Sequence, residues 1–159
     1  MAADTVTTVI LIRHADRDLP PAGTPDIPGP SLNDKGMARS RTLVHVLSTA
    51  GIQAVYTSLY ARAKMTAKPF LARHPGLPTV RLSAATELKD HILTHRAGQT
   101  VLVVGHSDTV PALIALLGGP SLPIIDDCEF DNLFVLVKHS TTKASVSKLK
   151  YGEPTSAPC

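Results

Sequence analysis

Two strand-like segments of this 159-residue chain end in the same way, each with a histidine. Residues 9–12 are apolar and mostly β-branched, and the run stops at Arg13 and His14. Residues 100–104 form the strongest strand pattern in the chain and lead directly into Gly105 and His106. Ligands of open α/β sheets bind at the carboxyl ends of the strands. If these two strands are neighbours, we expect both imidazoles at the same edge of the sheet.

A further cation, Arg62, is expected at this edge. It lies in the first turn of a predicted helix that follows a strand at residues 52–56. Guanidinium groups bind oxyanions in a planar, bidentate way and keep their charge at any physiological pH. Arg13 and Arg62 together with the two histidines therefore predict a site for a dianionic oxyanion, for which phosphate is the best match.

A histidine in such a site can act as a nucleophile. It would form a phosphorylated imidazole, which water then cleaves. The attacking nitrogen must be unprotonated, so the other ring nitrogen has to donate a hydrogen bond to a fixed acceptor. We expect His14 to play this part, with no metal and no cofactor, since no Cys/His spacing in the chain is typical of a zinc site.

The reaction also benefits from an acid that protonates the leaving oxygen. Glu87, which follows the predicted strand at residues 78–82, is the best-placed carboxylate, and Asp16, Asp18 and Asp108 are the alternatives. General acid help is typically worth about 10²–10⁴-fold in rate. Without it we expect a slower enzyme and not an inactive one.

Taken in order, these motifs resemble those of the histidine phosphatase superfamily, which has the phosphoglycerate-mutase-like fold. The family's Arg-His-Gly reads Arg13-His14-Ala15 here, and its Gly-His-Ser is present at residues 105–107. Its Ser-x-x-x-Arg-Ala-x-x-Thr-Ala motif is unbroken, at Ser58, Arg62, Ala63, Thr66 and Ala67. Leu32 and Gly36 also match the family's leucine and glycine at the first helix. The resemblance extends from residue 8 to about residue 151.

The resemblance implies a role for each of these residues. His14 would be the phosphoacceptor, Glu87 the proton donor, and the phosphate ligands would be Arg13, Arg62 and His106. The chain departs from the family in three places. Ala15 replaces a glycine, residues 16–18 (Asp-Arg-Asp) replace Glu-Thr or Glu-Ser, and the segment after Glu87 lacks the usual glycine.

Chain length separates the branches of the family. Mutases of this family carry long insertions between the third and fourth strands, whereas only one short helix is predicted between Glu87 and His106. We therefore expect a phosphomonoesterase that acts on a small phosphorylated metabolite or a phosphoprotein. The alternatives are a phospho-ligand binding module with little or no turnover, for which Ala15 is one possible cause, and a phosphoglycerate-type mutase.

Strands alternate with helices along the chain, which predicts a three-layer α/β/α sandwich with a mainly parallel central sheet. Besides the segments already given, strands are expected at 133–137 and 144–149, and helices at 35–50, 60–73, 87–96 and 109–117, the second of them kinked or shortened by Pro69. The pattern indicates one domain over residues 1–151 and a flexible tail at 152–159. The loops at 19–30 and 120–127 are candidates for the rim of the site.

Composition excludes several other classes of function. The net charge is +3, no run of Lys or Arg occurs, and aromatic residues make up 4% of the chain, so nucleic-acid binding is not indicated. No apolar run approaches the roughly 20 residues of a membrane span.

No signal peptide is visible, which favours the cytoplasm, although a chain whose leader had been replaced by a start Met would look the same. The two cysteines do not suggest a disulfide framework, and Cys128 is interpreted as a packing or surface thiol. No pattern in the sequence indicates the physiological substrate or the oligomeric state.

Overall fold

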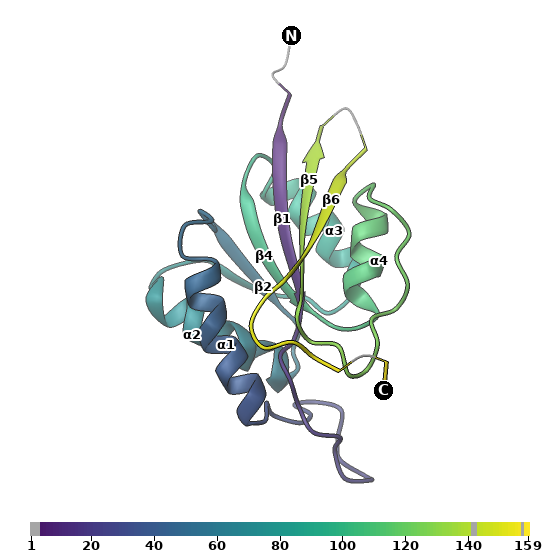
Figure 1. Ribbon diagram of the computed structural model, residues 1–159. Helices are drawn as coiled ribbons and strands as arrows, with labels where there is room; N and C mark the ends of the chain where they lie inside the picture. Colours follow the sequence, from purple (N-terminus) through teal and green to yellow (C-terminus); the bar gives the residue numbers. More distant parts are fainter. Residues whose placement is uncertain (1–3, 141–142, 157) are drawn as a thin grey trace.

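A six-stranded sheet forms the middle layer of the protein (Figure 1). The computed structural model describes residues 4–140, 143–156, 158 and 159. The strands are β1 (Val6–Arg13), β2 (Ala54–Thr57), β3 (Thr79–Arg81), β4 (Thr100–Gly105), β5 (Asn132–His139) and β6 (Ser145–Lys150), in the order β3-β2-β4-β1-β5-β6. The four strands β3, β2, β4 and β1 are parallel, and β5 and β6 are antiparallel to their neighbours.

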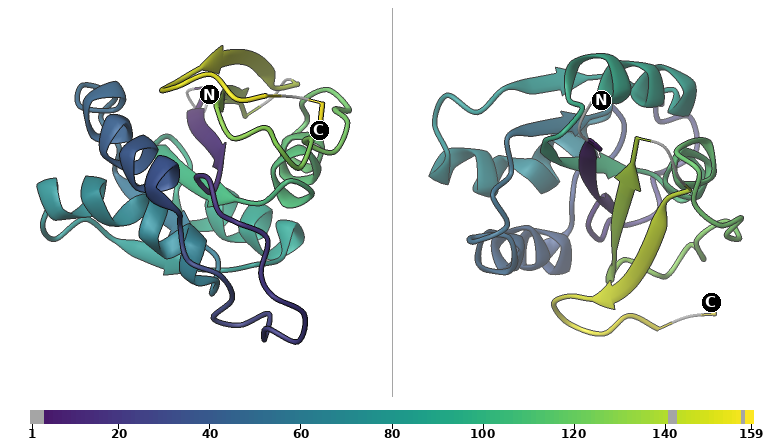
Figure 2. Two further views of the ribbon diagram at one scale, coloured as in Figure 1. Left: turned by 60° about the horizontal axis from the view of Figure 1, so that its bottom comes forward. Right: turned by 90° about the horizontal axis from the view of Figure 1, so that it is seen from above.

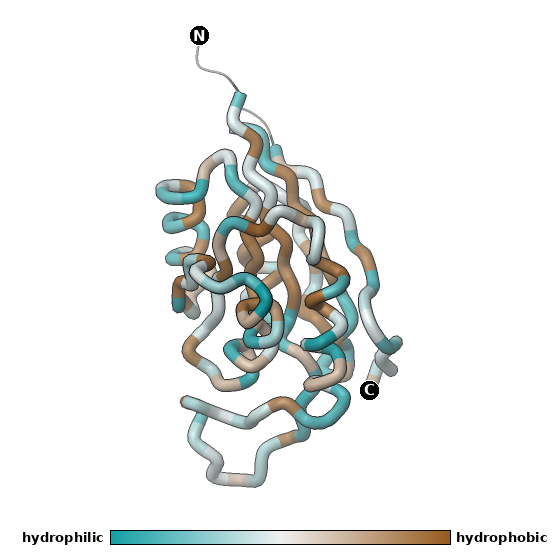
Figure 3. Tube along the Cα trace, turned by 90° about the vertical axis from the view of Figure 1, so that its left-hand side faces the viewer, coloured by the Kyte–Doolittle hydropathy of each residue, from teal (hydrophilic) through white to brown (hydrophobic). Residues whose placement is uncertain are grey.

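Helices cover both faces of the sheet (Figure 2). Helices α1 (Asp34–Val46) and α2 (Ala61–Arg73) lie on one face, and α3 (Ala85–His95) and α4 (Thr109–Leu116) lie on the other. Successive residues of β1 point to opposite faces, so Leu11 packs with α3 and α4 while Ile10 and Ile12 pack with α1 and α2. The apolar residues therefore run along the inner strands (Figure 3). The predicted three-layer sandwich with a mainly parallel sheet is confirmed.

Strands β1 and β4 are direct neighbours, with Arg13 opposite Gly105. Strand β2 lies on the other side of β4. The chain segments that follow β1, β2 and β4 consequently leave the sheet at one edge. This arrangement brings His14, Arg62 and His106 to the same region, as the sequence predicts.

The sequence predicts that Pro69 kinks or shortens α2, and the structure shows that it does not shorten it. The helix continues through it to Arg73. A proline removes one backbone donor from a helix. Its neighbours Ala67 and Phe70 are almost fully buried in the core cluster on this face of the sheet.

The start of α1 lies directly against the segment that follows His14. Asn33 caps the helix, and its side-chain oxygen accepts a hydrogen bond from the Gly36 amide at 2.9 Å. A Cβ atom on Gly36 would collide with the backbone carbonyl of Asp16. The glycine therefore permits a close approach of helix and loop that no other residue would allow.

The described residues of the tail contact the body of the protein at three places. Arg39 donates a hydrogen bond to the Glu153 carbonyl at 2.8 Å, and Thr155 donates one to Asp131 at 2.8 Å. Cys159 forms a disulfide with Cys128. The prediction that Cys128 is a free thiol is thus wrong, because nothing in the local sequence indicates that the chain returns to this loop after β6. No helix within the described ranges has the length and apolar character needed to cross a membrane.

Candidate active site

A cavity of about 630 Å³ opens at the carboxyl edge of the sheet and contains most of the predicted site residues. We call it the histidine pocket. Its lining combines the two histidines with three arginines: Arg13, His14, Arg17, Tyr60, Arg62, Ser83, Ala84, His106, Ser107, Asp108, Thr109, Ile124 and Asp127. Of the two predicted rim loops, 120–127 contributes to this lining, and 19–30 does not.

His14 is 2% exposed, and one of its ring nitrogens already forms a hydrogen bond. Nδ1 lies 2.8 Å from the carbonyl oxygen of Ala15. A carbonyl can only accept, so Nδ1 carries the hydrogen and Nε2 keeps a free lone pair. This is the arrangement that a nucleophilic imidazole requires.

Burial keeps both imidazoles neutral. It lowers the pKa of His14 to about 2, and the charges of Arg13 and Arg62 act in the same direction. Burial also lowers the pKa of His106 to about 4, again with help from Arg62. The two ring centroids lie 5.3 Å apart. Neither ring needs to lose a proton before it can act near neutral pH.

Arg13 is held by backbone carbonyls. Its Nη1 donates to the carbonyl oxygens of Asp126, Asp127 and Glu129 at 2.9, 3.1 and 3.0 Å. The guanidinium carbon lies 4.2 Å from the centre of the Phe130 ring. Nε is buried and has no hydrogen-bond partner. Burial lowers the pKa of Arg13 to about 10, so the group stays cationic and keeps donors free for a ligand.

Arg62 is held against an aromatic face. Its guanidinium carbon lies 4.5 Å from the centre of the Tyr60 ring, and its buried Nε has no partner. The proline-rich loop packs behind this side chain. At Gly29, where φ is +74°, an added Cβ would lie 2.9 Å from the Arg62 Nη1. The loop thus supports Arg62 from outside the pocket.

Two hydroxyl groups of the unbroken motif connect the parts of the site. Ser58 Oγ and His106 Nε2 share a hydrogen bond of 2.7 Å. Thr66 Oγ1 donates to the Arg62 carbonyl at 2.7 Å and accepts from the Ala15 amide at 2.9 Å. The motif contained these residues, but the sequence alone did not indicate what they bind.

Asp16 forms an ion pair with Arg39 inside the protein. Arg39 Nε lies 2.6 Å from Asp16 Oδ2, and Arg39 also donates to the carbonyls of Tyr151 and Glu153 at 2.8 Å each. The pair joins the segment after His14 to α1 and to the tail. Sequence reasoning missed this anchor and considered Asp16 as an acid.

Glu87 does not reach the histidine pocket. It is exposed in the first turn of α3 and lines a separate surface pocket with Asp90 and His91. Helix α3 starts at Ala85, two residues earlier than predicted. The preceding loop contributes Ser83 and Ala84 to the histidine pocket instead.

The other carboxylates considered as proton donors are also accounted for. Asp18 is exposed and accepts a hydrogen bond from Asn33. Asp108 lines the pocket and caps α4, where its Oδ1 accepts from the Thr109 amide at 2.9 Å. Asp127 is exposed at the rim. Among the described residues, no buried carboxyl lines the histidine pocket.

Within the described part of the chain, three residues of kinds that can bind metal ions lie close together: Asp126, Cys128 and Cys159. Its two sulfur atoms are bonded to each other. The group is therefore not a metal site in this state, and it lies outside the histidine pocket.

The chain belongs to the histidine phosphatase superfamily, whose branch 1 model matches residues 9–89. Solved structures share its fold. A protein provisionally assigned as the phosphohistidine phosphatase SixA from Agrobacterium tumefaciens is 20% identical, with a TM-score of 0.68 over 93% of this chain and 98% of the other. The protein histidine phosphatase SixA complexed with tungstate is 19% identical, with a TM-score of 0.68 over 90% and 96% of the two chains.

An alpha-ribazole phosphatase from Shigella flexneri also has this fold. It is 14% identical, with a TM-score of 0.67 over 90% of this chain and 96% of that one. No curated protein sequence matches the chain.

The buried imidazole predicts a loss of stability in acid. Below about pH 6.5 His14 takes up a proton in the unfolded state but stays neutral in the native state. The free energy of unfolding therefore falls as the pH falls. Between pH 7.5 and 5 this group should lower the free energy of unfolding by about 2 kcal/mol. Urea unfolding at pH 7.5 and pH 5 should show this loss in the wild type and a correspondingly smaller one in His14→Gln. The exposed His45→Gln is the matched control, and equal acid losses in all three proteins would contradict the prediction.

The disulfide predicts a dependence of stability on reductant. Cys128 and Cys159 are separated by 31 residues, and closing a loop of this size is worth about 3–4 kcal/mol in the chain-entropy model. Urea unfolding with and without dithiothreitol should reveal a loss of this order on reduction. Cys159→Ser should match the reduced protein and ignore the reductant. Equal stability of the wild type in both conditions would show that the bond contributes nothing.

Proposed function

We propose that the protein hydrolyses phosphorylated substrates through a phosphohistidine formed at Nε2 of His14, without a metal ion. The observation that carries the proposal is the state of this ring. It is buried and neutral, its Nδ1–H is donated to the Ala15 carbonyl, and the ring lines a pocket together with Arg13 and Arg62. Membership of the histidine phosphatase superfamily supports it.

The first step transfers the phosphoryl group to the enzyme. The free donors of Arg13 and Arg62, together with His106, bind the phosphoryl oxygens and neutralise their charge. The Nε2 lone pair of His14 attacks phosphorus, and the bond to the leaving group breaks with its electron pair on the leaving atom. The Ala15 carbonyl, bonded to Nδ1–H, stabilises the positive charge that the ring acquires.

The second step returns the enzyme to its starting state. A water molecule attacks the phosphorus of phosphohistidine, the P–N bond breaks, and its electron pair returns to Nε2. Inorganic phosphate leaves, and the ring is neutral again. Because Nδ1 keeps its hydrogen throughout, His14 needs no change of tautomer between the steps.

The lack of a buried acid in the described pocket favours particular substrates. A general acid that works near neutral pH is typically held protonated by burial, whereas Asp108 and Asp127 are exposed and Glu87 lies elsewhere. We therefore propose substrates whose leaving group is stable without such a proton. A phosphorylated imidazole is one, since it departs as a neutral ring when its other nitrogen is protonated. That one similar structure is a protein histidine phosphatase complexed with tungstate supports this choice.

The alternatives have less support. Ala15 is fully buried, its amide bonds to Thr66, and it needs no positive φ, so its methyl group gives no reason for a loss of turnover. Only α3 connects β3 to β4, and no insertion between these strands is available to close over a mutase substrate. A phosphatase acting on a small phosphorylated metabolite is the second candidate, favoured by the open cavity.

Removal of the nucleophile tests the mechanism. His14→Ala should reduce the hydrolysis of 4-nitrophenyl phosphate at least about 10³-fold, because the proposed covalent intermediate forms on this ring. Acid quenching of the wild type should trap an acid-labile phosphoenzyme that the variant lacks, and EDTA should change nothing. The exposed His45→Ala serves as control. Full activity in His14→Ala would disprove the mechanism.

The dependence on the leaving group tests the proposed substrate class. Across a series of aryl phosphates, kcat/KM should fall steeply as the pKa of the released phenol rises, since no acid relieves the developing charge. Glu87→Gln should stay within about twofold of the wild type, whereas loss of a true general acid costs about 10²-fold or more. Asp108→Asn is the companion variant inside the pocket. If kcat/KM does not depend on the phenol pKa, or if Glu87→Gln loses activity a hundredfold, a general acid takes part in the reaction and the proposed substrate class is wrong.

A further inference from the structure

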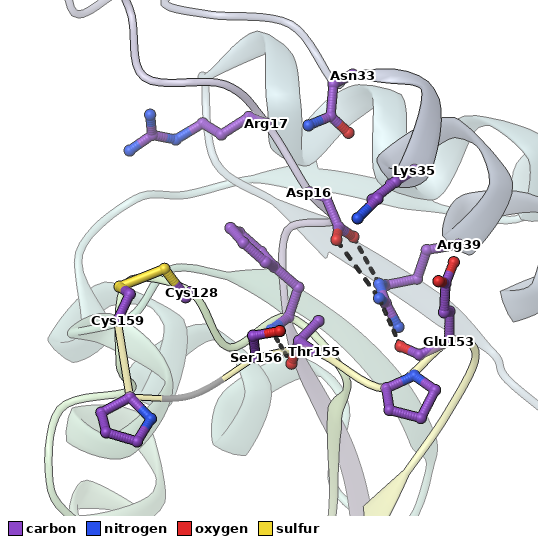
Figure 4. A pocket seen from close by; sticks show the side chains of 13 residues that line it. Asp16, Arg17, Asn33, Lys35, Arg39, Cys128, Glu153, Thr155, Ser156 and Cys159 are labelled. Carbon is purple, nitrogen blue, oxygen red and sulfur yellow. Dashed lines mark hydrogen bonds and ion pairs between the residues drawn. A yellow bond between two sulfur atoms is a disulfide. The ribbon is translucent and has the colours of Figure 1, made fainter.

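Arg17 lines the histidine pocket but has no part in the mechanism above. It also lines a second cavity of about 300 Å³ (Figure 4), which we call the tail pocket. The tail pocket lies between the start of α1 and the described residues of the tail. Arg17 borders both cavities, so one guanidinium can act on ligands in either of them.

The donors of Arg17 are largely unused. Among the described residues it forms no ion pair, and its one hydrogen bond runs from Nη1 to the neighbouring carbonyl of Asp18 at 3.2 Å. Its Nε is buried and has no partner, as in Arg13 and Arg62. In Figure 4 the side chain extends away from the Asp16–Arg39 ion pair. A buried charged donor without a partner is unfavourable, and an anionic ligand relieves it.

A second free cation faces the tail pocket. Lys35 is exposed in the first turn of α1 and has no ion-pair partner in the described part of the chain. The carboxylate of Asp16 is occupied by Arg39, and each of the three nitrogens of Arg39 already donates a hydrogen bond. Glu153 is the remaining acidic residue of the lining and is exposed to solvent. Arg17 and Lys35 are therefore the groups available to an anion.

The tail pocket also reaches an aromatic ring that lies close to the proposed nucleophile. Phe130 lies 5.9 Å from His14, centroid to centroid, and also lines the tail pocket. Arg17 is close enough to the phosphate-binding groups for its charge to lower the pKa of Arg13, Arg62 and His106. A substrate whose phosphoryl group is on His14 can thus extend past Phe130 towards Arg17.

We propose that the tail pocket is a subsite for a second anionic group of the substrate, bound by Arg17 with Lys35. The preferred substrate then carries a carboxylate or a further phosphate close to the phosphoryl group that is transferred. The inference rests on the proposed function, since it takes the first phosphoryl group to bind at His14. Arg17 acts as a specificity-determining residue, and its planar fork suits a carboxylate better than a single ammonium does.

Binding of non-hydrolysable ligands tests the subsite without relying on turnover. The probes are 3- and 4-carboxyphenylphosphonate, each compared with the carboxamide of the same shape, by calorimetry at low ionic strength. The wild type should bind at least one carboxylate about 10-fold more tightly than its carboxamide, as expected for a charge-assisted contact. Arg17→Gln should abolish this ratio, and Lys35→Gln should reduce it a few-fold.

Two variants control for folding and for charge alone. Arg17→Lys keeps the charge and should retain part of the ratio, whereas Lys68→Gln removes a cation that lines a different surface pocket and should retain all of it. A ratio near one for both isomers in the wild type, or an unchanged ratio in Arg17→Gln, would overturn the subsite. If the wild type binds neither the carboxylates nor the carboxamides, the proposed phosphate site at His14 fails, and the subsite fails with it.

Discussion

The central constraint in this protein is that the arginines of the histidine pocket, unlike the buried Arg39, are held without an ion-paired carboxylate. Arg13 is fixed by three backbone carbonyls and by the face of Phe130, and Arg62 by the face of Tyr60. Carbonyl dipoles and ring faces orient a guanidinium but do not neutralise it. A carboxylate in the same place would cancel the field that attracts an oxyanion. The neutral imidazoles and the unused arginine donors all depend on this choice of supports.

Much of the fold and the centre of the site could be predicted because their signals are local. A run of β-branched residues that ends in Arg13-His14 marks a buried strand and its functional end, and residues 100–106 repeat the pattern. The supports of these side chains could not be predicted. The carbonyls that hold Arg13 belong to backbone, which every residue has, and the partner of Asp16 lies on a helix whose packing is set by tertiary structure.

The positions of Glu87 and Cys128 differ from the sequence-based expectations, since neither position is set by the local sequence alone. Glu87 was placed by its distance from a predicted strand, whereas it lies in the first turn of α3 and lines another surface pocket. Cys128 has no local feature that points to Cys159, and the two meet because the chain turns back through the β5–β6 hairpin and its tail packs on the body of the protein. The cytoplasmic location stays a prediction. The disulfide weighs against it, because such bonds persist mainly in oxidising compartments.

The position of β1 in the sheet has a consequence for the order of folding. Thr8 pairs with Thr100 on one side and with Val137 on the other. The strand that precedes the nucleophile is therefore synthesised first, and both of its partner strands are synthesised much later. Pairings between such distant segments slow folding, since a long loop must close before they form. Until then this apolar strand has two unpaired edges during synthesis. The central position of β1 shields His14 from water in the folded protein. In the growing chain it leaves an apolar, aggregation-prone strand exposed until its partners are made.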